Sequence, residues 1–422
     1  MTIPNLRYNL VVLGADFSLF LVGLSFASQS TILPAFAEHL GASNVVIGAI
    51  PAVMTLGWFL PSLFAAGHTV TLARKLPFVL RWTIWERAPF ILLALAAFFL
   101  AGQAPGLTLA VLLSMLLVIT GTGGVLLPAW MDIVGRAIPT ALRGRFFGVA
   151  SLLGSLGGFL GSFGTAYFLE AFPAPAGYGV CFASAALFMA LSYAALMLAR
   201  EPPATAALPP ARALSAYLSG LPALLHRDRN LTWFLVARCF TVTAMMASGF
   251  YTVYALRAWG APDSQVGVFT AVMFGGLVVA NVGLGWLADR AGHLLVLGLG
   301  AAATVAANVM ALAAPSLEAF TVVFALAGVQ AAAVNVSGLT VLLEFAAHAD
   351  EQATYVGLGT TSMAPVAFLT PLLAGVMADA LGFEAVFAVA TVSGIVGLAV
   401  LIGRVRDPRW ASDNRGNFQG GT

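Results

Sequence analysis

Charged residues are scarce in this chain of 422 residues. Aspartate, glutamate, lysine and arginine make up 9% of it, hydrophobic residues make up 60%, and the mean hydropathy is +0.95. A soluble protein carries about 25% charged residues, so this composition cannot cover a water-facing surface. We therefore expect a lipid bilayer to surround much of the molecule. The net charge of +2, with scattered arginines, argues against a nucleic-acid partner.

Cysteine and histidine are also rare. Cys181 and Cys239 lie in apolar runs and form neither a disulfide framework nor a metal-ligand pattern, so we interpret both as buried thiols. The five histidines lie near predicted loops and far apart in the sequence. No H-E-x-x-H, G-x-S-x-G or phosphate-binding loop occurs. We therefore expect no enzymatic activity, no metal site and no cofactor.

Long apolar runs fill the chain. A membrane-spanning helix needs about 20 mostly apolar residues. The first such run contains Asp16 and ends without an A-x-A cleavage site, so we interpret it as an uncleaved span rather than a signal peptide. The predicted fold is an all-α integral membrane protein. Its twelve transmembrane helices are expected near 9–37, 44–66, 77–100, 107–131, 146–169, 178–199, 231–256, 264–287, 294–314, 317–345, 353–378 and 383–403.

The distribution of arginine and lysine predicts which side each loop faces. With the N-terminus in the cytoplasm, fifteen of the 19 basic residues fall on cytoplasmic segments, and only Arg257 falls on an outer one. This asymmetry is the positive-inside pattern. We therefore predict a multi-pass protein of the inner (cytoplasmic) membrane with both termini in the cytoplasm.

The longest interruption divides the chain near its middle. We predict an N-terminal six-helix bundle over 1–199, a cytoplasmic linker over 200–230, a C-terminal six-helix bundle over 231–403 and a cytoplasmic tail over 404–422. A short amphipathic helix in the linker would lie on the membrane surface, and a flexible proline-rich segment is an equal alternative for 201–211. The apolar face of that helix would consist of Leu214, Tyr217, Leu218 and Leu221.

The two halves of the chain resemble each other. The stretch 39–58 aligns with 258–277, and 143–164 occupies the place of 352–375. In the first alignment Gly41, Gly48 and Gly57 coincide with Gly260, Gly267 and Gly276. Such repeats are typical of secondary transporters, whose substrate site lies between the halves near the bilayer midplane. Chance similarity between two segments rich in glycine, alanine and leucine is the alternative.

One loop carries a family resemblance. The stretch "GWLADRAGH" follows the predicted eighth span and resembles the loop signature of the major facilitator superfamily, with His293 at its basic position. The matching residues are Gly285, Asp289, Arg290 and Gly292. The resemblance implies a transporter of two pseudo-symmetric bundles, with a gating role for this loop. The equivalent first-half stretch, 65–75, keeps Arg74 and Lys75 but lacks the aspartate.

The predicted fifth span carries a second similarity to that family. Gly148, Gly157 and Gly161 have the spacing of the glycine-rich motif of exporters, although Ser162 stands at its proline position. Small residues at this spacing also let helices approach closely, and we favour that packing role over a signature of transport direction. The stretch 130–148 is similar to a bacterial branch of the family with unassigned substrates.

Four charges fall near the middle of the bilayer. At a rise of about 1.5 Å per residue, Asp16, Glu86, Arg87 and Arg238 lie about 12–15 Å from the cytoplasmic ends of spans one, three and seven. Each charge would cost about 2.5 kcal/mol or more without a partner or water. Adjacent helical residues point about 100° apart. We therefore predict that Glu86 and Arg87 do not pair with each other.

We predict instead an ion pair between Asp16 and Arg87, with Glu86 bonded elsewhere or protonated. Such a pair has an equally good interpretation as a device that only fixes helix packing. The resemblance implies that spans one and seven line a central cavity, and we predict that Arg238 faces it. Gln330 and Asn335 are weaker candidates for the transport pathway, because polar residues in spans more often form interhelical hydrogen bonds.

These features predict a secondary active transporter that moves a small organic solute by alternating access. Carboxylates at membrane depth are the expected carriers of protons, so we predict proton coupling, and the partial glycine motif favours export. Proton-coupled uptake of a nutrient is the alternative. A non-transporting sensor built on a transporter scaffold is a third hypothesis. Asp132 and Glu344 lie close to predicted cytoplasmic loops and are expected to be solvated gate residues.

Overall fold

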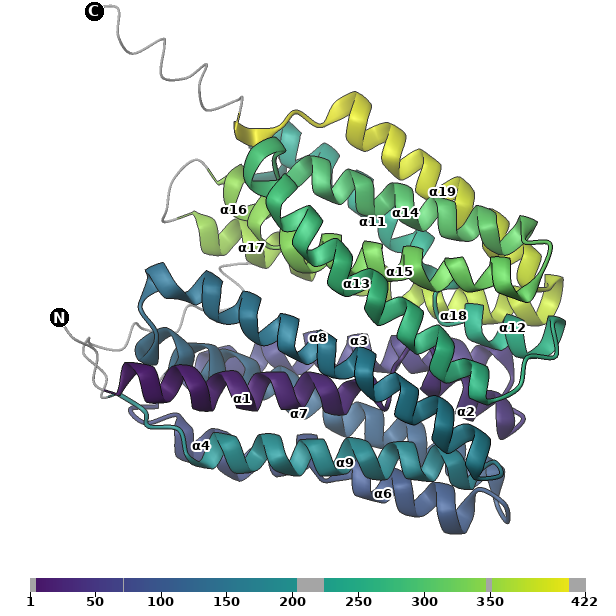
Figure 1. Cartoon of the computed structure of the whole chain (residues 1–422). Coiled ribbons are helices and arrows are strands. Elements are labelled where there is room, and N and C mark those ends of the chain that lie inside the picture. Colours follow the sequence, from purple (N-terminus) through teal and green to yellow (C-terminus); the bar gives the residue numbers. More distant parts are fainter. Residues whose placement is uncertain (1–4, 71, 203–223, 347–350, 410–422) are drawn as a thin grey trace, which may run out of the picture.

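The computed structural model consists of long apolar helices (Figure 1). It describes residues 5–70, 72–202, 224–346 and 351–409, with the backbone alone for 63–70 and 353. Over these ranges twelve helical segments are long and apolar enough to cross a membrane, and no strand occurs. The predicted all-α fold with twelve spans is therefore confirmed. The predicted linker helix, and the tail after residue 409, lie outside the described residues.

The first half of the chain forms the lower bundle in Figure 1. Its third span is divided into four short helices. The boundary between α5 and α6 falls at Pro89, which has no backbone N–H to donate. The helices are α1 (Leu6–Ser25), α2 (Ile32–His39), α3 (Asn44–Val70), α4 (Leu76–Trp82), α5 (Ile84–Arg87), α6 (Pro89–Leu95), η1 (Ala96–Leu100), α7 (Pro105–Ala137), α8 (Thr140–Ala171) and α9 (Ala176–Met197).

The second half forms the upper bundle, and both ends of the described chain lie at the left of Figure 1. Its seventh span is interrupted between α11 and α12, as the first span is between α1 and α2. The helices are α11 (Arg229–Ala244), η2 (Met245–Ala247), α12 (Tyr251–Ala258), α13 (Ser264–Ala291), α14 (His293–Ala313), α15 (Leu317–Ser337), α16 (Thr340–Phe345), α17 (Gln352–Thr361), α18 (Ala364–Leu381) and α19 (Phe383–Arg404).

Several predicted spans are not single helices. The run 9–37 is broken between Ser25 and Ile32, and the run 317–345 is broken between α15 and α16. The expectation of a continuous helix is wrong at these places, because hydropathy measures whether a segment fits lipid and not whether its backbone is regular. The thiols also differ: Cys181 is buried as expected, whereas Cys239 is only half-buried.

The glycines matched between the two halves occupy equivalent positions. Gly41 and Gly260 both have positive φ, 74° and 61°, and each lies in the short loop before a long helix. A Cβ on Gly57 would lie 2.0 Å from Thr120 Oγ1 of α7, and one on Gly276 would lie 2.6 Å from the Ala325 carbonyl oxygen of α15. The repeat seen in the sequence is therefore a repeat of helix crossings.

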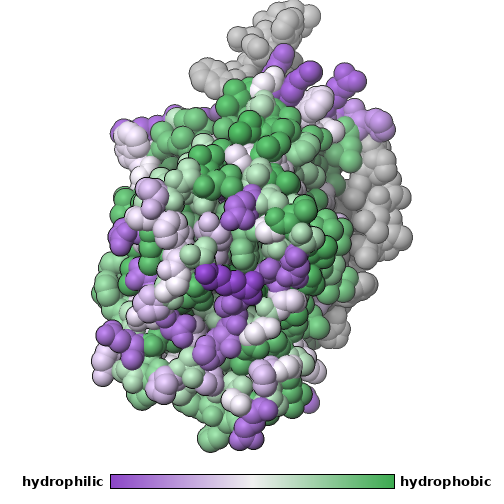
Figure 2. All heavy atoms as spheres, turned by 90° about the vertical axis from the view of Figure 1, so that its right-hand side faces the viewer, coloured by the Kyte–Doolittle hydropathy of each residue, from purple (hydrophilic) through white to green (hydrophobic). Residues whose placement is uncertain are grey.

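The bundles meet on the face away from the termini, which we call the closed face. There Arg257 of α12 donates from Nε to Glu38 Oε1 at 2.7 Å and pairs through Nη2 with Glu38 Oε2. Asp379 of α18 accepts hydrogen bonds from the backbone N–H groups of Asn44 and Val45. Figure 2 looks onto this face, where hydrophilic residues gather across the middle. Polar contacts thus join the two halves here.

Two cavities separate the bundles on the side opposite to the closed face, which we call the terminus side. One, of about 880 Å³, lies between α3 and the α17–α18 region, and we call it the central cavity; residues at its wall include Gln29, Thr55, Trp58, Phe59, Leu127 and Thr360. A second, of about 610 Å³, lies between α8 and α13 and is called the α8–α13 cavity; its wall includes Gly148, Asn281, Gly285, Asp289, His293 and Asn335. The molecule is therefore joined on the closed face and separated towards the termini.

Candidate functional site

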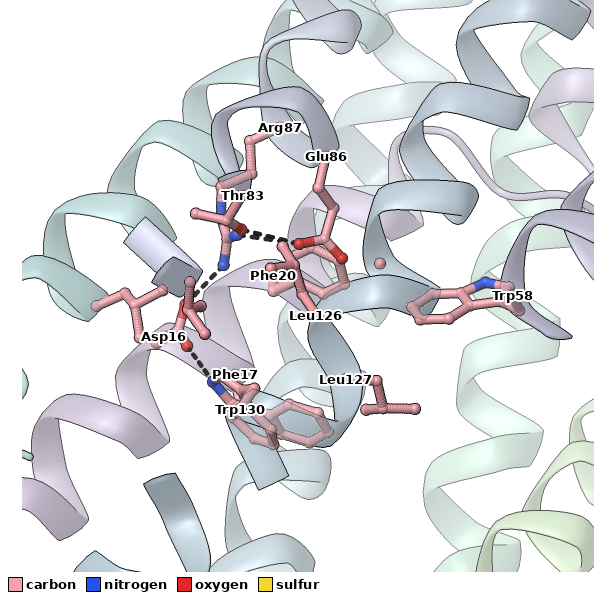
Figure 3. A pocket seen from close by; sticks show the side chains of 13 residues that line it. Asp16, Phe17, Phe20, Trp58, Thr83, Glu86, Arg87, Leu126, Leu127 and Trp130 are labelled. Carbon is pink, nitrogen blue, oxygen red and sulfur yellow. Dashed lines mark hydrogen bonds and ion pairs between the residues drawn. The ribbon is translucent and has the colours of Figure 1, made fainter. Parts of the chain in front are cut away.

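The predicted ion pair between Asp16 and Arg87 is present in the first bundle (Figure 3). Arg87 Nη2 lies 2.9 Å from Asp16 Oδ1, and both residues are buried. The guanidinium also lies over the Phe20 ring, 5.2 Å from its centroid. Contacts from α1 therefore hold the cation of α5 in place, as the equal depths of Asp16 and Arg87 suggested.

Glu86 joins the same cluster, so the prediction that Glu86 and Arg87 do not pair is wrong. Arg87 Nη1 donates to Glu86 Oε2 at 3.2 Å. The prediction followed the direction of the Cβ atoms. The guanidinium, however, stands at the end of a long side chain, and a buried charge lowers its free energy by reaching every available counter-charge. Burial therefore overrides the angular separation of adjacent residues.

Three polar side chains complete the cluster, and sequence reasoning did not select them. Ser192 of α9 donates to Asp16 Oδ1 at 2.7 Å, Trp130 Nε1 of α7 donates to Asp16 Oδ2 at 3.1 Å, and Thr83 donates to Glu86 Oε2 at 2.9 Å. Only Thr83 had a signal in the sequence, because residues three apart share a helix face. The other two depend on how α7 and α9 are rotated.

The charges in this cluster do not balance. Two carboxylates face one guanidinium, so the ionised cluster carries one excess negative charge. A net charge buried at membrane depth is costly unless a proton or a cation compensates it. The Arg87 Nε–H is also buried and has no hydrogen-bond partner in the described structure. Hydrogen bonds and ion pairs therefore hold the cluster together, but its excess negative charge is not compensated by any described residue.

A small cavity opens beside the cluster. It has a volume of about 110 Å³, and we call it the ion-pair cavity. Trp58, Glu86, Arg87 and Trp130 are among the residues at its wall. Its floor includes Gly123, where a Cβ would lie 2.7 Å from Glu86 Oε1 and 2.8 Å from the Trp58 ring. The absence of a side chain at Gly123 therefore leaves room for the second oxygen of Glu86.

The ion-pair cavity adjoins the central cavity. Trp58 of α3 and Leu127 of α7 line both. Figure 3 shows the Glu86 carboxylate pointing towards Trp58, on the side of Arg87 away from Asp16. Within the described residues, Glu86 Oε1 takes part in no hydrogen bond. This oxygen is the group of the cluster best placed to meet a proton or solute entering from between the bundles.

The other predicted pathway residues divide between two cavities. Arg238 and Gln330 line a cavity of about 320 Å³ in the second bundle, which we call the Arg238 cavity. Phe59 of the first bundle lines both this cavity and the central cavity. Asn335 instead lines the α8–α13 cavity. Gln330 and Asn335 are five residues apart on α15, and the structure does not bring them together.

The predicted gating loop lies at the mouth of the α8–α13 cavity. Gly285 and Asp289 are at the wall of that cavity, and the Arg290 guanidinium lies 4.0 Å from the centroid of the Trp286 ring. Gly292 has φ of 100°, which favours glycine. A Cβ there would also strike Arg409, which pairs with Asp407 beyond α19. The loop therefore packs against the segment that follows the twelfth span.

The glycines of the fifth span do not share one role. A Cβ on Gly157 would lie 2.4 Å from Val22 Cγ2, and one on Gly161 would lie 2.9 Å from the Phe26 ring, so both lie at a close approach to the first span. The expected packing role does not hold for Gly148, because no atom lies within 4 Å of its Cβ position. That residue lies at the wall of the α8–α13 cavity instead.

Asp132, predicted to be a solvated gate residue, belongs to a charge cluster near the terminus side of the first bundle. It pairs with Lys75 at 2.8 Å and with Arg136 at 2.6 Å. Glu201 accepts hydrogen bonds from the backbone N–H groups of Lys75 and Leu76. Glu344 on the other bundle is half-buried, and its Oε2 has no hydrogen-bond partner in the described structure.

Comparisons with known proteins support the resemblance seen in the loop signature. Residues 234–420 match the sequence model of the Major Facilitator Superfamily. Solved transporters of that type superpose on nearly the whole chain. The chain has the major facilitator fold. A search of curated proteins finds no match.

Three solved structures illustrate this fold match. A variant of the nucleoside transporter NupG has 12% identity and a TM-score of 0.68 over 94% of this chain and 99% of that chain. An inward-facing, unoccupied bacterial homologue of the human lysosomal transporter Spinster has 14% identity and a TM-score of 0.66, covering 95% and 96%. A POT family transporter in complex with a thioalcohol-conjugated peptide has 11% identity and a TM-score of 0.67, covering 93% and 94%. At these identities the likeness shows the major facilitator fold alone.

Proposed function

We propose that this chain is a secondary active transporter that exports a small organic solute in exchange for protons. The observation that carries the proposal is the incomplete charge of the cluster of Asp16, Glu86 and Arg87 beside a cavity that adjoins the space between the bundles. A proton at Glu86 would complete this charge, and a protein that binds the proton and the solute in alternation couples the two fluxes. Glu86 is the proposed proton carrier, and Asp16 holds Arg87 in position.

Alternating access is supported by the arrangement of the bundles. The closed face carries polar contacts between the halves, including the pair of Glu38 and Arg257, whereas the terminus side has two cavities between them. Opening the closed face requires those contacts to break while contacts on the terminus side form. The positive-inside pattern supports a cytoplasmic location for the terminus side. We place the protein in the cytoplasmic membrane on this basis.

Export is the proposed direction because the spacing of Gly148, Gly157 and Gly161 in α8 resembles the glycine-rich motif of exporters. Gly157 and Gly161 lie close to α1, the helix that carries Asp16. Proton-coupled uptake remains the competing direction, since structures with this fold include a nucleoside transporter and a transporter holding a peptide conjugate. A transporter scaffold that only senses its solute is the third outcome to be tested.

Everted membrane vesicles with an acidic interior separate these three functions. A pH-sensitive dye reports the gradient while a broad panel of organic compounds is added outside. We expect at least one compound to dissipate the gradient in wild-type vesicles, because an exporter moves it inwards while protons leave. This response should be lost in Glu86→Gln and kept in Glu318→Gln, whose exposed carboxylate lies at the start of α15.

The other outcomes contradict the proposal in different ways. Dissipation that occurs only when the compound is preloaded inside the vesicles would show uptake by symport. Binding without any effect on the gradient from either side would favour a sensor. A response that persists unchanged in Glu86→Gln would retain transport and remove Glu86 from the proton pathway.

A further inference from the structure

Arg238 lies in a cavity that contains no other charged group. The cavity is in the second bundle, between α11, α14, α15 and α18. Apolar side chains cover most of its wall, and Arg238 is the one ionisable residue among the described residues that line it. The apolar part of the wall includes Phe59, Phe234, Val242, Met245, Leu297, Val334, Met363 and Leu401.

The Arg238 guanidinium has no partner within the described residues. It donates no hydrogen bond and forms no ion pair there. Apart from the backbone hydrogen bonds of α11, Arg238 receives one hydrogen bond, from Thr241 Oγ1 to its carbonyl oxygen at 3.2 Å. Arg87, the other arginine considered at this depth, contacts Asp16, Glu86 and Ser192. A cation at membrane depth needs a counter-charge or water. The second bundle supplies the cation without the counter-charge.

The donors that remain available in this cavity belong to Arg238 and Gln330, because the hydroxyl hydrogens of the two threonines at its wall are already used. Thr304 donates to the Gly300 carbonyl of its own helix at 3.1 Å, as Thr241 does to its helix. The Gln330 amide nitrogen lies 3.2 Å from Met245 Sδ and retains a second hydrogen. The guanidinium adds up to five N–H donors in one plane. This set matches the oxygens of an anion.

The Arg238 cavity lies next to the central cavity. Phe59 of α3 forms part of its wall and part of the wall of the central cavity. A solute entering from the terminus side would therefore meet Arg238 beside an apolar surface on which a hydrocarbon or aromatic body can rest.

We propose that Arg238 binds the anionic group of the transported solute, and that the substrate class is organic monoanions with an apolar body. The proposal deepens the transport function proposed above and rests on it. Arg238 supplies the charge and the bidentate hydrogen bonds, Gln330 supplies a further donor, and the apolar wall binds the rest of the molecule.

Matched pairs of carboxylates and amides test this directly. The full-length chain in phosphatidylcholine nanodiscs is heated with 3-phenylpropionate or 6-phenylhexanoate at neutral pH, and with the corresponding neutral amides. A compound that binds the folded state raises the unfolding temperature. We expect each carboxylate to bind more tightly than its amide, by roughly 10- to 100-fold, as for hydrogen bonds to a charged group.

Substitutions locate the effect. The preference for the carboxylate should disappear in Arg238→Gln, survive in part in Arg238→Lys, and remain in Arg404→Gln, which removes an exposed arginine stacked on Trp233. Equal binding of acid and amide by the wild type, or a preference that persists in Arg238→Gln, would overturn the proposal. So would Arg238-dependent stabilisation by phosphatidylglycerol in the nanodisc without any by the carboxylates, because the anion would then be a lipid.

This test and the vesicle test fail separately. A chain that dissipates the gradient through Glu86 but binds acid and amide equally keeps its transport function and loses this substrate class. A chain with an Arg238-dependent preference and no proton movement keeps the anion site and loses proton coupling.

Discussion

Arg87 is the residue on which the first-bundle cluster depends. It is the one cation that contacts both Asp16 and Glu86 in the described structure, and it also receives support from Phe20 and Ser192. Removing a partner from a buried ion pair leaves an uncompensated charge, which costs more than the pair itself contributes. The stability of the bundle should therefore respond strongly to a change at this position.

Replacing Arg87 alone should lower the free energy of unfolding more than replacing Arg87 and Asp16 together. We expect Arg87→Met to lower the free energy of unfolding by about 3–5 kcal/mol, because two carboxylates are left without a cation. Adding Asp16→Asn to this variant should restore part of the loss. Thermal unfolding of the purified chain checks this, with Arg404→Met as the matched exposed control. Equal losses in the single and double variants would show that the charges are not coupled.

Glu344 gives the fold a dependence on pH. It lies in α16, outside the twelve spans. Burial raises the pKa of its carboxyl above the ordinary value, and the negative charge of Asp407 raises it further. The positive charges of His293 and Arg409 lower this pKa, but burial has the larger effect. Because the folded pKa exceeds the unfolded one, ionisation of Glu344 destabilises the folded state. This cost is absent below the unfolded pKa and complete above the folded pKa.

Glu344→Gln should therefore raise the unfolding temperature at pH 8. The difference from the wild type should shrink as the pH falls and vanish near pH 4, about where the unfolded carboxyl titrates. Melting curves across this range provide the measurement. A difference that grows towards acid pH would mean that the ionised carboxylate stabilises the fold.

The helix crossings show why the internal repeat could be seen in the sequence. Gly57 and Gly276 allow α3 and α13 to approach their neighbours within each bundle in equivalent ways. Gly48 and Gly267 allow close approach between the two bundles. A Cβ on Gly48 would lie 2.2 Å from the Pro371 carbonyl oxygen, and one on Gly267 would lie 2.3 Å from Ala166 N. Backbone atoms cannot move aside as side chains can. Glycine is required at these positions by contact, which is why it recurs in both halves.

Alanine at the matched glycines should destabilise each bundle. We expect Gly57→Ala and Gly276→Ala to cost about 1–3 kcal/mol each, as overpacking does. Gly148→Ala and Gly283→Ala are the controls, because no atom lies within 4 Å of either Cβ position. Unfolding of the four variants in parallel tests the assignment. Similar stability in all four would mean that the crossings relax without cost.

Sequence reasoning located parts of the site for identifiable reasons. The pairing of Asp16 with Arg87 followed from their equal depth, since the helix rise fixes position along the bilayer normal. The contacts of Ser192 and Trp130 did not follow, because they depend on the rotation of α9 and α7 about their own axes. The pairing of Glu86 with Arg87 was excluded by a rule for exposed helices that burial overrides. The sequence predicted how deep a residue lies in the membrane, but it did not predict in which direction its side chain points around the helix axis.

At the scale of the whole molecule, the bundles are joined on one face and separated on the other, as expected for one of the two states of the alternating access proposed above. Contacts between the bundles are concentrated on the closed face, where Arg257 of α12 reaches Glu38 of α2 and the side-chain oxygen of Asn44. The Thr31 and Thr270 hydroxyls lie 2.8 Å apart between the halves. Weakening these contacts should therefore favour the state that opens on this face.

Arg257→Gln should increase access to the closed face. A cysteine at Thr270, which is fully buried between the bundles, is labelled from outside by a membrane-impermeant maleimide. Losing the pair with Glu38 is expected to raise the labelling rate about two- to fivefold, the effect of a partly exposed ion pair of about 0.5–1 kcal/mol. The same cysteine with Arg404→Gln is the control. An unchanged rate would show that Arg257 does not hold this face closed.

If Glu86 carries the proton of an alternating-access cycle, as we propose, its protonation should change which face is open. Spin labels are attached at Ser43 of the first bundle and Ala258 of the second, which are exposed residues on the closed face. The native Cys181 and Cys239 are replaced by alanine. The distribution of distances between the two labels then reports whether the closed face is open. We predict that the distribution differs between pH 5.5 and pH 8.5 in the wild type, and that Glu86→Gln shows the acidic distribution at both values. A wild-type distribution that does not change with pH, or a Glu86→Gln chain that still responds, would contradict the account.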